Sequence, residues 1–113
     1  MSVESGSVDA RVDGATHHLV VSGPIGRDAA RQIDFLVRHG MWEPPTGVVI
    51  DISRVDEVSG SLLGALLRAS RRLAWRNRRL TIVSSRREHW RPLQTAGIDE
   101  LADLVAAPPP QRD

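Results

Sequence analysis

The sequence predicts a small α/β sandwich, in which helices pack on a mixed and mostly parallel sheet in the order β-β-α-β-α-β-α. The first observation is the stretch 48–67, where an apolar run ends at Asp51 and a polar turn leads into leucines at helical spacing. The second is the alternation of strand and helix signals across residues 48–84, which indicates parallel strands joined by a right-handed crossover. The third is an opening pair of strands joined at Asp13 and Gly14, a dipeptide typical of hairpin turns.

The first half of the chain is expected to hold this hairpin and one helix. Residues 8–13 alternate apolar and polar side chains, as a strand with one covered face does, and residues 18–22 form the second strand. Residues 28–39 place apolar side chains at helical spacing. Gly40 and the Pro-Pro pair that follows are expected to end this helix and to force an extended link.

The second half is expected to continue the alternation. Residues 48–52 have the composition of the most buried strand. The remaining predicted elements are a long helix over 62–75, a strand over 79–84, a short helix over 88–96 that Gly97 closes, and a last turn of helix or strand over 101–105.

The chain of 113 residues is long enough for one domain with one hydrophobic core. We place that domain at residues 8–105. Residues 1–7 are polar and are expected to be a flexible N-terminus, and residues 106–113, with three consecutive prolines, are expected to be a disordered tail.

Composition narrows the classes of function. The formal net charge is +1, so no overall field indicates a nucleic acid or a membrane as the partner. The chain has no cysteine, and no apolar stretch approaches the roughly 20 residues of a membrane span, so we expect a cytoplasmic protein. All 15 basic residues are arginine, which fits either codon bias in a GC-rich genome or selection for bidentate guanidinium contacts.

Groups that would carry catalysis or bind a metal or a cofactor are scarce. His17 and His18 are neighbours in a predicted strand, so their rings point to opposite faces and do not share a metal ion. His39 and His89 are isolated in the sequence, and we expect all four histidines on the surface. The Gly-Ser-Leu-Leu-Gly segment at 60–64 is not a phosphate loop, and there is no lysine to contact a phosphate. We therefore expect no metal, no cofactor and no enzymatic activity.

Four segments together resemble the STAS-domain family, the anti-sigma-factor antagonists. One is the strand end at Asp51–Ser53, with the turn and helix start over residues 58–67. The others are Val21–Ile25 with the helix after it, the strand at 78–83, and the segment 92–101, which resembles the family's closing Leu-x-x-x-Gly-Leu-Asp-x-Leu signature. The resemblance covers about residues 8 to 105 and implies the STAS fold.

The resemblance also implies a non-catalytic docking module. In the best-known branch, an anti-sigma factor that is also a serine kinase phosphorylates the antagonist and thereby releases it. By position, the phosphoacceptor here is Ser61, with Ser59 as the second choice. The implied partner-binding residues lie in the turn, at the start of the long helix and in the loop after the second strand: Pro24, Ile25, Gly26, Asp51, Ser53, Ser59, Gly60, Ser61, Leu62 and Leu63.

This chain departs from the family pattern around the acceptor. Ser59 stands where the family has an acidic residue, Leu62 stands where it has a glycine, and Gly26 replaces a frequent aspartate. The alternative is therefore a small STAS subunit of a lipid-transport ATPase, which docks without a phosphorylation switch. Leu62 itself is expected either on a wide apolar helix face or in the docking patch.

An arginine run on the long helix is the other candidate surface. Arg68, Arg71, Arg72 and Arg76 recur at helical spacing with Trp75 and Arg79, which predicts a single basic stripe with one aromatic side chain. Such a stripe is either a solvated face or a site for an acidic protein, nucleic acid or anionic lipid. Nucleic acid is the weakest of these predictions, because acidic residues elsewhere balance the charge and no nucleic-acid-binding motif is present.

Overall fold

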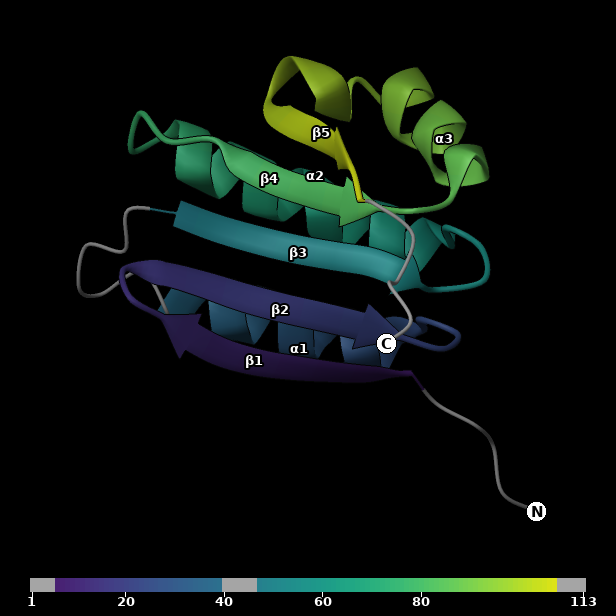
Figure 1. Cartoon of the computed structure of the whole chain (residues 1–113), viewed down its shortest axis with the longest axis horizontal. Coiled ribbons are helices and arrows are strands. Elements are labelled where there is room, and N and C mark those ends of the chain that lie inside the picture. The colour runs from purple at the N-terminus through teal and green to yellow at the C-terminus, as the bar shows by residue number, and fades with distance from the viewer. Residues whose placement is uncertain (1–5, 40–46, 108–113) are drawn as a thin grey trace, which may run out of the picture.

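Five strands form one sheet, and the two long helices pack on one of its faces (Figure 1). The computed structural model describes residues 6–39 and 47–107. The elements in chain order are β1 (Ser7–Asp13), β2 (Thr16–Ser22), α1 (Arg27–His39), β3 (Gly47–Arg54), α2 (Gly60–Ala74), β4 (Leu80–Ser84), the 3-10 turn η1 (Arg87–His89), α3 (Trp90–Thr95), the 3-10 turn η2 (Ile98–Glu100) and β5 (Ala102–Ala106). The predicted α/β class is confirmed.

The strands follow one another across the sheet in the order of the sequence. β1 and β2 are antiparallel and form the predicted hairpin, where Gly14 adopts a positive φ of 63° that glycine tolerates without strain. The pairs β2–β3, β3–β4 and β4–β5 are all parallel. The carboxyl ends of β2, β3 and β4 therefore meet at one edge of the sheet, toward the right in Figure 1.

The hydrophobic core lies between this sheet and helices α1 and α2. Along β3, Val48, Ile50 and Ile52 are buried, whereas the side chains between them are only half-buried, as expected for a strand with one covered face. The fully buried large apolar side chains that meet in this core are Val21, Ile33, Ile50, Ile52, Leu62, Leu66, Leu73, Leu80, Ile82, Leu93 and Ile98.

The predicted order ended on the helix over 88–96 and left residues 101–105 open as a last turn of helix or strand, and the structure decides for the strand, because residues 102–106 form β5. The register pairs Leu80 of β4 with Ala102 and Ser84 with Ala106, and the amide of Ala107 also donates to the carbonyl of Ser84, at 3.0 Å. The five residues have no decisive pattern of their own. Residues 102–106 become a strand because the backbone N–H and C=O groups along the edge of β4 need hydrogen-bond partners.

Two residues that were expected in the chain ends belong to the sheet. Ser7 is already the first residue of β1, and Ala106 is the last residue of β5. The rest of both predicted ends (1–5 and 108–113), and the predicted link after Gly40, lie outside the described residues. Within the described residues, no helix is both long and apolar enough to cross a membrane.

Candidate functional site

Three loops leave the carboxyl edge of the sheet and build the candidate site. They are the loop after β2 (23–26), the turn between β3 and α2 (55–59), and the loop after β4 (85–86). The carboxyl edge is where open α/β sheets generally bind ligands, because successive loops converge there. We refer to residues 55–59 as the β3–α2 turn.

Ser59 is the N-cap of α2, and its hydroxyl makes two hydrogen bonds. Its backbone is extended, with φ −74° and ψ 164°, and its Oγ accepts a hydrogen bond from the amide of Leu62 at 3.1 Å. The same hydroxyl donates to the carbonyl oxygen of Ile25 at 2.6 Å. Ser59 therefore caps the helix and also ties its start to the loop after β2.

Ser61 lies in the first turn of α2 and differs from Ser59 in its contacts. Its side chain is half-buried and makes no hydrogen bond to the part of the chain that the structure describes. The amides of Gly60 and Ser61 have no intrahelical acceptor because of their position at the helix start. No acidic residue occupies this first turn. A hydroxyl without an internal partner therefore sits beside the positive end of the helix dipole.

The end of β3 is fixed by hydrogen bonds within the strand and to the next loop. The carboxylate of Asp51 accepts from the amide of Ser53 at 2.9 Å. The hydroxyl of Ser53 in turn accepts from the amide of Ser85, also at 2.9 Å, which joins the β3 end to the loop after β4. These two predicted site residues hold backbone in place with their side-chain oxygens.

Arg86 braces the β3–α2 turn from the loop after β4. Its Nε donates to the carbonyl oxygen of Ser53 at 3.1 Å, and its Nη1 lies 3.6 Å from the carboxylate of Asp56. The Asp56 side chain is 87% exposed, so water screens this ion pair strongly. Arg86 was not among the predicted site residues, because its partners are thirty or more residues away in the sequence.

His89 is buried, so the prediction of a surface histidine is wrong. Its Nε2 lies 2.8 Å from the carbonyl oxygen of Val55, and its Nδ1 lies 2.7 Å from the hydroxyl of Ser84. A carbonyl oxygen only accepts, so Nε2 donates to Val55, and in the tautomer that carries its proton on Nε2 alone, Nδ1 accepts from the hydroxyl of Ser84. The Ser84 hydroxyl also accepts from the amide of Arg86 at 3.0 Å. One side chain thus ties the β3–α2 turn to β4 and η1.

The loop after β2 completes the site. Gly23 has a positive φ of 79°, and its amide donates to the carbonyl of Arg54 at 3.2 Å. Pro24 and Gly26 are exposed, and the carbonyl of Gly26 accepts from the amide of Ala30 at 3.0 Å in the first turn of α1. The loop is thus held on both sides and presents its exposed residues next to the start of α2.

The structure brings the predicted partner-binding residues to one edge, with two exceptions. Ile25 is 3% exposed and Leu62 is fully buried, so the prediction that these side chains contact a partner is wrong. Leu62 belongs to the wide apolar face of α2. The buried side chains of Leu62 and Ile25 pack beneath the exposed residues of the candidate site. The remaining predicted residues are exposed or half-buried: Pro24, Gly26, Asp51, Ser53, Ser59, Gly60, Ser61 and Leu63.

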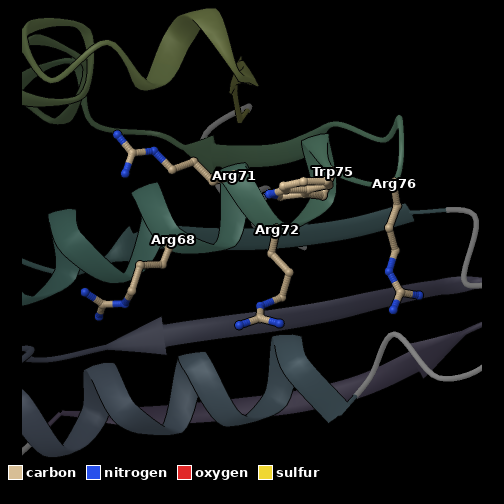
Figure 2. Close-up of a pocket in the computed structure, with 5 residues that line it drawn as sticks. All are labelled: Arg68, Arg71, Arg72, Trp75 and Arg76. Carbon is tan, nitrogen blue, oxygen red and sulfur yellow. The ribbon is translucent and has the colours of Figure 1, made fainter.

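The predicted single basic stripe is also corrected. α2 ends at Ala74, so Arg76 and Arg79 lie beyond the helix, and Arg79 pairs with Asp103 at 2.9 Å. Figure 2 shows Arg68, Arg72 and Arg76 directed toward α1, whereas Arg71 points away from it. The arginine side chains therefore point in two directions from α2 instead of forming one line.

Among the described residues, no group of three histidine, cysteine, aspartate or glutamate side chains could hold a metal ion. The groups at the carboxyl edge are hydroxyls, backbone amides, the carboxylates of Asp51 and Asp56, and the guanidinium of Arg86. This chemistry suits recognition of a surface, with one hydroxyl available for modification.

Comparison with solved structures shows the same fold. An anti-sigma factor antagonist from Mycobacterium paratuberculosis is 20% identical, with 88% of this chain and 85% of that chain covered and a TM-score of 0.74. RsbS of Moorella thermoacetica, carrying a serine-to-glutamate substitution, is 16% identical, with 90% and 87% covered and a TM-score of 0.76. The antagonist SpoIIAA in its unphosphorylated form is 14% identical, with 91% and 90% covered and a TM-score of 0.64.

No curated protein sequence matches this chain. A family model described as "Mlab, STAS domain" matches residues 8–106, which is most of the sequence. The match includes all five strands, both long helices and the three loops of the candidate site. The chain therefore belongs to the STAS-domain family.

Proposed function

We propose that this STAS domain is a non-catalytic regulatory protein that binds an anti-sigma factor in the cytoplasm and thereby antagonises it. The observation that carries the proposal is that two nearby serines have different hydrogen-bonding roles. Ser59 holds the start of α2 in place, while the hydroxyl of Ser61, two residues further along the chain, has no hydrogen bond within the described residues. The names of the similar solved structures support an anti-sigma factor as the partner.

The proposed docking surface is the carboxyl edge of the sheet. Hydrogen bonds from Ser53, Arg86 and His89 hold this edge before any partner arrives. A preorganised surface loses little conformational entropy on binding, which favours a specific complex. The residues proposed to contact the partner are Pro24, Gly26, Ser53, Gly60, Ser61 and Leu63.

Phosphorylation of Ser61 by a serine kinase partner is the proposed control. A phosphate adds a charge of about −1.5 to −2 at pH 7. The fold would tolerate that charge, because the helix dipole favours an anion at this end and Ser59 retains the cap. A partner packed against Ser61 would instead lose contact through repulsion and through the desolvation of the phosphate.

The test is reconstitution with a purified anti-sigma factor kinase and ATP. We expect a complex on size-exclusion chromatography, phosphate on Ser61 by peptide mapping, and dissociation once the phosphate is present. Ser61→Ala should bind and resist phosphorylation, whereas Ser61→Asp should not bind. Thr95→Asp is a matched control, because Thr95 is an exposed hydroxyl residue on α3, outside the three loops of the candidate site, and this substitution should leave binding intact.

A second candidate is the STAS subunit of a lipid-transport ATPase, which would use the same edge for permanent docking. It is favoured by the absence of any acidic residue in the first turn of α2 and by the use of Ser59 as a cap. Under this alternative, protein from the native host carries no phosphate under any growth condition and co-purifies with an ATPase. Its complex would also survive Ser61→Asp far better than the anti-sigma complex.

A further inference from the structure

The second half of α2 carries a cationic surface around one exposed aromatic ring. Arg68, Arg71, Arg72, Trp75 and Arg76 line an open depression of about 380 Å³ (Figure 2), and we call these five residues the Arg–Trp surface. This surface lies toward the end of α2 that is opposite to Ser61. It therefore does not overlap the docking edge proposed above.

Trp75 is held in an unusually exposed position. It follows the last residue of α2 and is 89% exposed, although a tryptophan ring is among the largest apolar groups in proteins. The chain turns back directly after it, since the amides of Arg76 and Arg78 both donate to the carbonyl of Leu73 at 2.9 Å. Asn77 adopts a left-handed φ of 58°, a conformation that asparagine tolerates better than most residues. This turn leaves the ring in water.

The charges around the ring are poorly neutralised. Arg71 and Arg72 are exposed and make no hydrogen bond or ion pair with the residues that the structure describes. Arg68 differs from these two arginines, because its Nη2 lies 3.0 Å from the carboxylate of Asp34 on α1. α2 itself contains no aspartate or glutamate, and Arg38 of α1 lines the neighbouring groove beside Arg72. Carboxylates are the complement of this surface.

We propose that the Arg–Trp surface binds a short acidic segment of a partner protein that carries an aromatic or aliphatic side chain. Carboxylates of the segment pair with Arg71 and Arg72, and its apolar side chain covers the ring of Trp75. The rise along α2 from Arg68 to its last residue, Ala74, is about 9 Å, at about 1.5 Å per residue. An extended segment of about four residues covers that distance.

The arrangement favours an acidic protein over nucleic acid or a membrane. A nucleic-acid strand presents a row of phosphates, whereas the side chains of Arg71 and Arg72 point in different directions (Figure 2). Membrane insertion requires a broad apolar face, and Trp75 is the single large exposed hydrophobic side chain on this surface among the described residues. One ring flanked by separate guanidinium groups matches one apolar side chain flanked by carboxylates.

Fluorescence anisotropy with a labelled peptide tests the proposal. The probe is a peptide of alternating aspartate and glutamate around one phenylalanine, titrated with the full-length chain at low ionic strength. The double substitution Arg71→Glu with Arg72→Glu should weaken binding by about tenfold or more, because attraction becomes repulsion at both sites. Trp75→Ala should weaken it by about fivefold. Raising the salt concentration should weaken the wild-type complex.

The matched control is Arg87→Glu with Arg91→Glu, which makes the same change in net charge on η1 and α3, at two other exposed arginines. This control should change the affinity by less than about twofold. An equal loss in the control, or no binding of the peptide, would overturn the proposal.

Two further probes test whether the Arg–Trp surface binds a nucleic acid or a membrane instead of an acidic protein segment. If oligothymidylate or vesicles containing phosphatidylglycerol bind more tightly than the peptide, and Arg71→Glu with Arg72→Glu abolishes that binding, the surface is a nucleic-acid or membrane site and the proposal is wrong. Circular dichroism should show an unchanged fold for each variant, since all the substituted side chains are exposed. Binding of an anti-sigma kinase at Ser61 is measured separately, so failure of one proposal leaves the other testable.

Discussion

The two ends of α2 differ in how the structure holds their polar groups. At the N-terminal end, the hydroxyl of Ser59 makes two hydrogen bonds, and Arg86 and His89 brace the turn that precedes the helix. At the C-terminal end, Arg71 and Arg72 have no partner among the described residues, and Trp75 is 89% exposed. The first end is rigid and leaves one hydroxyl unused, whereas the second consists of long side chains in water.

The two ends of α2 therefore fit the two different kinds of recognition surface that we propose on this helix. A braced turn suits a partner of matching shape, because few side chains must be ordered on binding. Arginines without carboxylate partners, such as Arg71 and Arg72, favour binding by electrostatic attraction. This attraction weakens as salt is added and depends little on the shape of the partner. Four substitution experiments test this difference between the two ends of α2, and the largest loss of stability is expected at the N-terminal end.

The largest effect is expected from Leu62, which anchors the N-terminal end in the core. Leu62→Ala should lower the free energy of unfolding by about 2–5 kcal/mol, because it leaves a cavity under the docking edge. Leu63→Ala, at a half-buried neighbour, should cost only about 1 kcal/mol. Urea denaturation measures both values. Equal losses would show that Leu62 is no more buried than Leu63.

The next effect is expected from His89. His89→Ala should lower the free energy of unfolding by about 1–3 kcal/mol, since Val55 and Ser84 each lose a buried hydrogen-bond partner. A double-mutant cycle with Ser84→Ala should give a coupling of about 0.5–3 kcal/mol. His18→Ala is the control, because His18 is half-buried on the sheet face away from α1 and α2, and it should cost about 0.5 kcal/mol. Additive losses would contradict the proposed contact between His89 and Ser84.

The two serines should respond differently to removal of the hydroxyl. Ser59→Ala should cost about 0.5–2 kcal/mol of stability, because the helix loses its cap and its tie to the loop after β2. Ser61→Ala should change the stability by less than about 0.5 kcal/mol. Thermal unfolding followed by circular dichroism compares the two variants. A larger loss from Ser61→Ala would mean that Ser61, not Ser59, is the cap.

The smallest effects are expected at the C-terminal end. Arg72→Ala should leave the free energy of unfolding within about 0.5 kcal/mol of the wild type, since the arginine has no partner in the described part of the chain. Arg68→Ala should cost about 0.2–1 kcal/mol through its pair with Asp34, and that cost should fall as salt is added. Urea denaturation at low and high ionic strength distinguishes the Arg72→Ala variant from the Arg68→Ala variant. A salt-independent loss at Arg68 would indicate packing instead of charge.

Most of the fold could be predicted from local patterns. The alternation in β1 and β2, the buried run in β3 and the leucines of α2 each depend on neighbours in sequence, and the observed elements match the predicted ones within a few residues. The order of strand, turn and helix around Ser61 also placed the candidate site at the carboxyl edge of a parallel sheet. β5 was not predicted as part of the sheet, because it exists only beside β4.

The contacts that shape the site were beyond sequence reasoning. His89 reaches Val55 and Arg86 reaches Ser53 across more than thirty residues, and no local pattern predicts such pairs. The burial of Leu62 and Ile25 depends on which face of each element meets the core. The choice of Ser59 over Ser61 as the cap depends on backbone angles at the helix start.

The sequence by itself determined the class of fold, the order of all but the last strand, and the place of the two candidate serines at the start of the long helix, because these follow from short-range periodicity and turn chemistry. Only the tertiary structure decided which serine is free, which leucine is buried, and which arginines are unpaired. Those properties depend on distant groups competing for hydrogen bonds, core space and opposite charges. They arise only when the strands and helices pack together.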